Sequence, residues 1–182
     1  DSNWVPTKDG YSLYIRPFMF ATDAYIGVKP SDTYSFVIFT SPVGAYYSKP
    51  PRVKVETEFN RAAEGGTGAT KCAGNYGGSL YPAKLAQQQG FDQLIWTDAR
   101  DHAFIEESGT MNILFDIDGT LVAPAVSSTI LDGVTRRSIV AVARHWGIPV
   151  EERKVSVQEI IDALKEGRMR SAFGAGTAVV VS

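Results

Sequence analysis

The 182-residue sequence predicts a mixed α/β fold with a strand-rich core. Two observations lead to this class. The first half is dominated by runs of aromatic and β-branched residues bounded by Gly, Pro and Asp, which is typical of strands. The second half alternates such runs with helical segments of amphipathic periodicity. A hydrophobic fraction of 44% is that of an ordinary globular chain, so wholesale disorder is excluded.

The first half is predicted to contain strands, a glycine-rich loop and one helix. Strands are expected over residues 12–20, 33–40 and 52–56, with a turn over 42–47. Six glycines fall in residues 65–78, which is too many for a stable helix, so a loop that approaches a ligand closely is expected there. A helix should follow over residues 79–89 and end at Gly90.

The second half is predicted to alternate strands and helices. Strands are expected over residues 93–98, 111–117 and 177–181, and helices over 133–146 and from Ser156 to Gly167. The pair Asp118-Gly119 favours a tight hairpin after the second of these strands. The spacing of Ile139, Val142, Ala143 and Trp146 predicts that this face of helix 133–146 points toward the core. Ser156 and Glu159 form the pattern of a capping box.

Composition excludes several classes of function. Lys and Arg number 18 against 20 Asp and Glu, so no basic excess points to a nucleic-acid partner. No apolar run is long enough to cross a membrane. Cys72 is the single cysteine, which excludes an intrachain disulfide and favours the cytoplasm. The chain opens without Met and stops within a strand-like run, so a fragment of a longer protein is expected.

The segment from Phe115 to Val122 reads F-D-I-D-G-T-L-V and has two interpretations. One is the nucleophile loop of haloacid-dehalogenase-type phosphatases, in which paired aspartates act beside Mg²⁺. The other is a hairpin with an Asp-Gly turn. That loop normally opens its domain, and no paired-aspartate motif follows here, so the hairpin is favoured. No metal site is predicted.

Lys71 lies in the glycine-rich segment and is the candidate nucleophile. The segment lacks the Gly-Lys-Ser/Thr ending of a P-loop, because Thr70 precedes the lysine and Cys72 follows it. A lysine that is buried or next to other cations loses its proton and can form an imine with an aldehyde. Tyr76, five residues later, could hydrogen-bond the same ligand.

Three further segments offer groups that could bind the same ligand as Lys71 and Tyr76. Glu106 or Glu107 could pair with a protonated ring nitrogen, and the turns at residues 130–137 and 174–178 offer backbone N–H groups to an anion. A lysine, a tyrosine, a carboxylate and two anion-holding turns are the protein groups that pyridoxal 5′-phosphate requires. The residues therefore predict this cofactor.

Four motifs in series resemble the branched-chain amino acid aminotransferases, which are pyridoxal-phosphate enzymes of fold type IV. They are G-G-T-G-x-x-K-x-x-G-N-Y-G at 65–77, E-S-G-T-M-N at 107–112, I-L-D-G-V-T-R at 130–136 and G-x-G-T-A at 174–178. Y-I-R-P at 14–17 and P-V-G-A-Y at 42–46 fit the same family. Each motif alone is weak, but the series is specific and covers nearly the whole chain.

The resemblance implies a role for each matching residue. Lys71 matches the Schiff-base lysine, Tyr76 the tyrosine at ring O3′, and Glu107, five residues before Asn112 as in the family, the carboxylate at the pyridine nitrogen. The matches to phosphate-binding residues are Val134, Thr135 and Thr177. The matches to substrate-binding residues are Tyr14, Arg16, Tyr46, Thr110 and Ala178.

The resemblance also implies a fold and an activity. Residues 1–182 would form the large cofactor domain, a pseudo-barrel with flanking helices, incomplete at both ends and without the N-terminal domain that supplies an arginine to the phosphate. The parent enzyme would transfer amino groups between Leu, Ile or Val and 2-oxoglutarate by a ping-pong mechanism in branched-chain amino acid metabolism or biosynthesis, as a homodimer. A D-amino acid aminotransferase or an aminodeoxychorismate lyase of the same fold remains an alternative.

Overall fold

The computed structural model describes residues 5–44, 50–177 and 180–181. The chain divides into two compact units, residues 1–48 and 49–182. The assignment of both units to one cofactor domain stays a prediction. No helix in the described part of the chain is long and apolar enough to span a bilayer.

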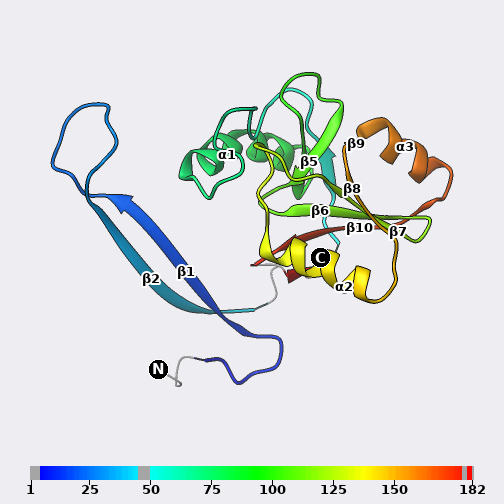
Figure 1. The fold of residues 1–182 in the computed structure, drawn as a ribbon, viewed down its shortest axis with the longest axis horizontal. Helices are drawn as coiled ribbons and strands as arrows, with labels where there is room; N and C mark the ends of the chain where they lie inside the picture. The colour runs from blue at the N-terminus through cyan, green and yellow to red at the C-terminus, as the bar shows by residue number, and fades with distance from the viewer. Residues whose placement is uncertain (1–4, 45–49, 178–179, 182) are drawn as a thin grey trace. The chain divides into compact units, whose positions relative to one another are not determined.

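The first unit is an antiparallel hairpin of β1 (Ser12–Ala21) and β2 (Tyr34–Val43), drawn in blue in Figure 1. Asp23 organises the connection between the strands, since its carboxylate accepts hydrogen bonds from the backbone N–H groups of Asp32 and Thr33. These bonds, the Asp32 N–H first among them, lower the pKa of Asp23 to about 2. The expected turn at 42–47 is wrong at its start, because Pro42 and Val43 belong to β2, and residues 45–47 lie outside the described part.

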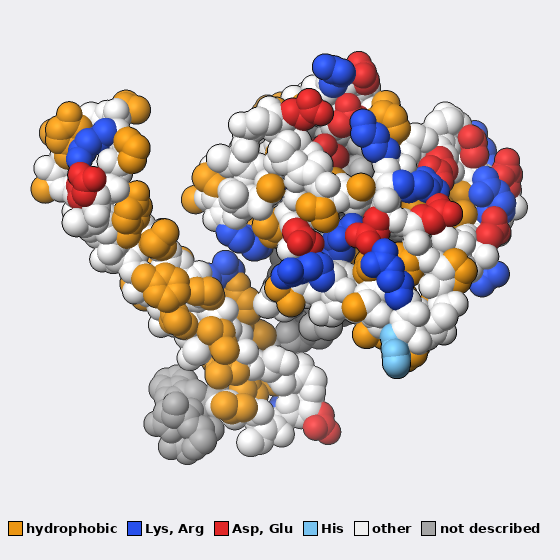
Figure 2. Space-filling view, in the orientation of Figure 1, with side chains coloured by type: hydrophobic (Ala, Val, Ile, Leu, Met, Phe, Trp, Pro, Cys, Tyr) orange, Lys and Arg blue, Asp and Glu red, His pale blue; other side chains and the backbone are white. Residues whose placement is uncertain are grey.

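Hydrophobic side chains of the hairpin are exposed within this unit. Figure 2 shows them over much of its visible surface, and they include Phe18, Phe20 and Phe39, whose rings stack or meet edge to face. A two-stranded sheet is marginal by itself and gains stability when its apolar residues are covered.

In its described residues the second unit combines two sheets with three helices, which confirms the mixed α/β class (Figure 1). One sheet has the order β11-β10-β6-β7-β8 and the other β3-β4-β5-β9. The strands are β3 (Val53–Val55), β4 (Gln93–Thr97), β5 (Phe104–Ser108), β6 (Asn112–Ile117), β7 (Thr120–Pro124), β8 (Val150–Arg153), β9 (Val155–Ser156), β10 (Met169–Gly176) and β11 (Val180–Val181), and the helices are α1 (Ala73–Gln88), α2 (Val134–His145) and α3 (Val157–Lys165).

Alternation along β6 connects three layers of the core. Ile113 and Phe115 point to one face and pack with Ile95, Ile105 and α3 residues, so this cluster joins the two sheets. Leu114 points to the other face, where α2 covers it with Val140 and Ala143.

A third cluster places Ala86 of α1 against Leu94 and Trp96 of β4.

The predicted Asp-Gly turn and the Ser156 half of the predicted capping box are confirmed. Asp118 and Gly119 have φ of 53° and 84° between β6 and β7, as a tight hairpin turn requires. The Ser156 hydroxyl accepts a hydrogen bond from the Glu159 N–H at the start of α3. The Glu159 carboxylate does not return to the cap, because it pairs with Arg153 instead.

Three predicted elements are wrong in their bounds or orientation. Helix α1 begins at Ala73, so residues 73–78 of the glycine-rich segment are helical. The low helix propensity of glycine is outweighed there by the tertiary surroundings. Helix α2 buries Arg136, Val140 and Ala143, whereas Trp146 is 72% exposed. Strand β10 is not expected from the sequence, because it lacks β-branched residues; of the strand expected at 177–181, residues 180–181 form β11 and Thr177 lies in a turn.

We predict that Gly78→Ala raises the free energy of unfolding by about 0.5–1 kcal/mol, because alanine is the better helix former and a Cβ at this position meets no atom within 4 Å. Urea unfolding of the full chain measures the change. Gly147→Ala is the matched control: its site is equally open, but its φ of +73° should make alanine destabilising. A loss of stability in Gly78→Ala would contradict a helical start at residues 73–78.

Candidate active site

Lys71 and Tyr76 meet at the start of α1. Cys72 is the N-cap residue, so Lys71 lies directly before the cap and Tyr76 lies in the first turn of the helix. The Lys71 Nζ donates a hydrogen bond to the Tyr76 Oη at 2.8 Å. Lys71 is exposed and Tyr76 half-buried, so the pair presents an amine and a phenol at an accessible surface.

The glycine-rich segment is fixed by its neighbours rather than free. Gly68 is buried, and a Cβ there would lie 2.7 Å from the Thr129 backbone. The Ala69 N–H donates to the Ser128 carbonyl at 3.0 Å, and the Asn75 amide donates to the carbonyls of Thr67 and Thr70. Close backbone packing therefore requires glycine at position 68 and sets the position of Lys71.

Glu107 projects from β5 into the interior and is 3% exposed. The Leu131 N–H donates to its Oε1 at 2.7 Å, and the Arg61 Nε lies 3.4 Å from its Oε2. Glu107, Tyr76 and Thr110 line one small cavity of about 20 Å³. Four predicted residues are thus close together: Tyr76, Glu107 and Thr110 line the cavity, and Lys71 contacts Tyr76.

Burial raises the pKa of Glu107 to about 7. The Arg61 guanidinium, the Leu131 N–H and the Lys71 ammonium each oppose that rise, while the neighbouring Glu106 adds to it. A carboxyl group with this pKa can hold or release a proton near neutrality.

Arg61 is a residue that the sequence reasoning missed. Its side chain is 8% exposed, and its Nη2 donates to the carbonyl oxygens of Gly68 and Thr129. It therefore joins the glycine-rich segment, the Thr129 segment and Glu107. A lone arginine four residues before Gly65 carries no recognisable signal, because only the fold brings it to a carboxylate 46 positions away in the sequence.

The N-terminus of α2 offers backbone donors at Val134 and Thr135. Gly133 is its N-cap and supplies no side-chain hydrogen bond. Because the first N–H groups of a helix lack partners within it, they can donate hydrogen bonds to an anion. A Cβ at Gly133 would meet the Asn112 Oδ1, so a side chain at this position requires Asn112 to move.

The remaining predicted residues are not joined to this group. Thr177 is exposed after β10, and Ala178 and Tyr46 lie outside the described residues. Tyr14 and Arg16 lie on β1 of the other unit, where the guanidinium stacks 4.9 Å from the phenol ring.

The hairpin interpretation of F-D-I-D-G-T-L-V accounts for its aspartates. The Gly119 N–H donates to the Asp116 Oδ1 at 2.9 Å, so the carboxylate stabilises the turn. In the described ranges no group of three His, Cys, Asp or Glu side chains could hold a metal ion.

Comparison with known sequences gives a consistent result. The family model described as amino-transferase class IV matches residues 3–181. All of the chain aligns, with 48% identity over 185 residues, to 51% of branched-chain-amino-acid aminotransferase 2 of Bacillus subtilis. It is 40% identical over 190 residues to the branched-chain-amino-acid aminotransferase of Mycolicibacterium smegmatis and covers 52% of it. The chain spans about half the length of these curated relatives.

Solved structures agree. The branched-chain amino acid aminotransferase of Escherichia coli matches with a TM-score of 0.78 and 30% identity, over 94% of this chain and 56% of that one. The branched-chain aminotransferase of Thermoproteus uzoniensis, solved with norvaline, matches with a TM-score of 0.82 and 26% identity, over 93% and 55%.

We predict that the raised pKa of Glu107 makes the cofactor-free chain less stable as the pH rises. The folded chain holds this proton up to about pH 7, whereas the unfolded chain releases it near 4.5, so the contribution is full below 4.5 and is lost as the pH passes about 7. Its upper limit is about 3 kcal/mol.

Urea unfolding at about pH 5 and about pH 8 measures this contribution. Glu107→Gln should lose the pH-dependent part, so the variant gains stability relative to the parent at the higher pH. Glu58→Gln, at an exposed position, is the control and should follow the parent. An equal difference between parent and Glu107→Gln at both pH values would contradict the raised pKa.

Proposed function

The chain belongs to the class IV aminotransferase family, and from this we propose that it is the cofactor-binding part of a branched-chain amino acid aminotransferase. The protein would transfer amino groups reversibly between Leu, Ile or Val and 2-oxoglutarate. The names of the relatives support the substrate class. The observation that carries the proposal is the grouping of Tyr76 and Glu107 at one cavity, with Lys71 hydrogen-bonded to Tyr76.

The residues present fit pyridoxal 5′-phosphate. An amine, a phenol and a buried carboxyl of raised pKa match the three functional groups of its ring, and the N-terminus of α2 suits its phosphate. When bound, this group supplies an electron-withdrawing ring that stabilises negative charge at the substrate Cα. Lys71 would anchor it, Val134, Thr135 and Thr177 would hold its phosphate, and Tyr76 would bond its ring oxygen.

Glu107 would keep the ring nitrogen protonated. A carboxyl with a pKa of about 7 shares its proton readily with a pyridine of similar basicity, and the Leu131 N–H and Arg61 stabilise it once it is ionised. The ring nitrogen would then carry the positive charge that electron withdrawal requires.

Lys71 would move the proton at the substrate Cα. Its amine must lose a proton to act as a base, and the Tyr76 hydroxyl at 2.8 Å orients it. Thr110, which lines the same cavity, would bind the substrate carboxylate. Tyr14, Arg16, Tyr46 and Ala178 would also bind substrate, and the protein would act as a cytoplasmic homodimer.

We predict that Lys71 is the anchoring lysine. Borohydride reduction of the cofactor-loaded full-length protein should fix the label on the peptide that contains Lys71, as peptide mapping by mass spectrometry would reveal. Lys84, which lies later in α1, is the internal control. Label on Lys84 with Lys71 unmodified would refute the assignment.

We predict that Glu107→Gln retains cofactor binding but lowers kcat for leucine and 2-oxoglutarate by about 100-fold or more, since an amide cannot balance a protonated ring nitrogen. Steady-state kinetics with the full-length protein measures the loss. Asp116→Asn is the control, because Asp116 only stabilises a turn. Loss of a Mg²⁺-dependent phosphatase activity in Asp116→Asn, with Glu107→Gln unchanged, would favour the phosphatase instead.

A further inference from the structure

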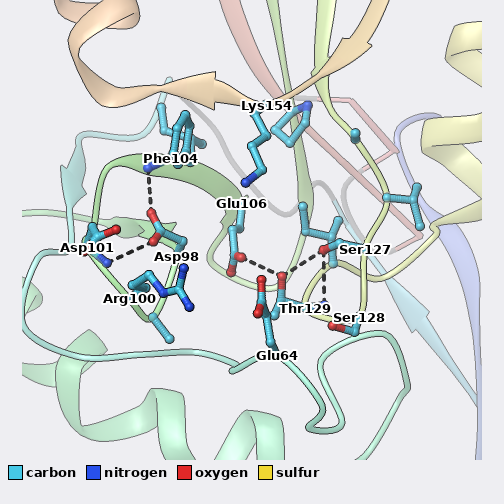
Figure 3. A pocket seen from close by; sticks show the side chains of 16 residues that line it. Glu64, Asp98, Arg100, Asp101, Phe104, Glu106, Ser127, Ser128, Thr129 and Lys154 are labelled. Atoms are coloured by element: carbon cyan, nitrogen blue, oxygen red, sulfur yellow. Dashed lines mark hydrogen bonds between the residues drawn. The ribbon is translucent and has the colours of Figure 1, made fainter.

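A second, larger cavity lies on the other face of β5. It has a volume of about 540 Å³ and shares no lining residue with the cavity at Glu107. Successive residues of a strand point to opposite faces, so Glu106 projects into this cavity while Glu107 faces the candidate active site. Figure 3 shows Glu106 near its middle, between Lys154 on one side and Glu64 on the other.

Glu106 has an unused acceptor. It is 8% exposed, and its Oε1 accepts a hydrogen bond from the Thr129 hydroxyl at 2.5 Å. Its Oε2 has no hydrogen-bond partner among the described residues. A buried carboxylate oxygen without a donor is costly, and burial accordingly raises the pKa of Glu106. A cationic N–H donor in the cavity would remove that cost.

Two cations at the cavity have no carboxylate partner in the described ranges. Arg100 and Lys154 line it from different loops, and neither forms an ion pair within the described ranges. The Lys154 ammonium lies 5.0 Å from the centre of the Phe104 ring. Asp98 forms no ion pair with either of them in the described ranges; its carboxylate accepts hydrogen bonds from the backbone N–H groups of Asp101, Ala103 and Phe104.

The rest of the lining mixes apolar and polar side chains. Phe104, Pro124, Val126 and Ile130 contribute hydrocarbon surface, whereas Glu64, Asp101 and the hydroxyl residues 127–129 contribute polar groups. The cavity therefore places carboxylates, two cations and hydrocarbon surface side by side, in a volume typical of small-molecule sites.

We propose that this cavity binds a free α-amino acid with a small apolar side chain. Its ammonium would donate to the Glu106 Oε2 after a small rotation of the carboxylate, its carboxylate would pair with Arg100 and Lys154, and its side chain would pack on Val126 and Ile130. The site is separate from the candidate active site and does not depend on the activity proposed above. Because Glu106 and Glu107 are consecutive, a ligand that restrains Glu106 also restrains the strand that carries Glu107.

The test uses 1-aminocyclopentane-1-carboxylate, a zwitterion without hydrogen on Cα, which no transamination can consume. Isothermal titration calorimetry on the cofactor-saturated full chain should detect its binding. Cyclopentanecarboxylate and cyclopentylamine, which each lack one charge, should bind at least about 10-fold more weakly, because each leaves one set of charges unpaired. Equal affinity for all three compounds would overturn the proposal.

Variants locate the site. Glu106→Gln and Lys154→Met should each weaken binding about 10-fold or more, whereas Glu166→Gln, at an exposed position away from the cavity, should not. Lys154 is exposed, so its variant keeps the test valid if Glu106→Gln fails to fold. Methyl NMR should show shifts at Val126 and Ile130. Absence of binding, unchanged affinity in both variants, or shifts confined to residues around Tyr76 would overturn the proposal.

Discussion

Glu107 is held in the interior by groups from two distant segments, the Leu131 N–H at 2.7 Å and the Arg61 guanidinium at 3.4 Å. Arg61 also binds the Gly68 carbonyl, and Leu131 lies just before α2. The contacts of one buried carboxyl therefore connect β5, the segment that carries Lys71 and the helix that offers N–H groups to an anion. The relative positions of these groups depend on it.

Burial of this carboxyl lowers the free energy of unfolding when the carboxyl is ionised. Burial raises the pKa of Glu107 to about 7, so the ionised form is disfavoured in the fold even with a guanidinium nearby. Stability and function make opposite demands at this position, which is common where a site must hold a charge in the interior. The Asp98 carboxylate shows the opposite case: bonded to three N–H groups of its own loop, it has a lowered pKa despite desolvation.

Local chemistry determined which parts of the fold could be predicted. The Asp118-Gly119 turn and the Ser156 cap depend on neighbouring residues, and both are confirmed. The start of α1 and the buried face of α2 depend on tertiary contacts: Arg136 takes a core position because it binds the Pro124 carbonyl and Glu152, which no periodicity reveals.

The same distinction applies to the candidate site. Lys71, Tyr76 and Glu107 could be identified because they lie in motifs with a recognisable order. Arg61 could not, because its partners are brought to it by the fold. The roles assigned to the candidate site residues, those of Lys71, Tyr76 and Glu107 included, stay predictions.

The contact between Gly133 and Asn112 limits how this site can change over evolution. Asn112 binds the Leu131 carbonyl at 2.7 Å and occupies the space where a side chain at position 133 would stand. A larger residue at 133 requires Asn112 to move or to become smaller, and either change weakens its bond to the Leu131 carbonyl, which then relies on the Gly133 N–H at 2.9 Å. Changes at the two positions are thus coupled, so the start of α2 should vary more slowly than the exposed positions of the helix that follows.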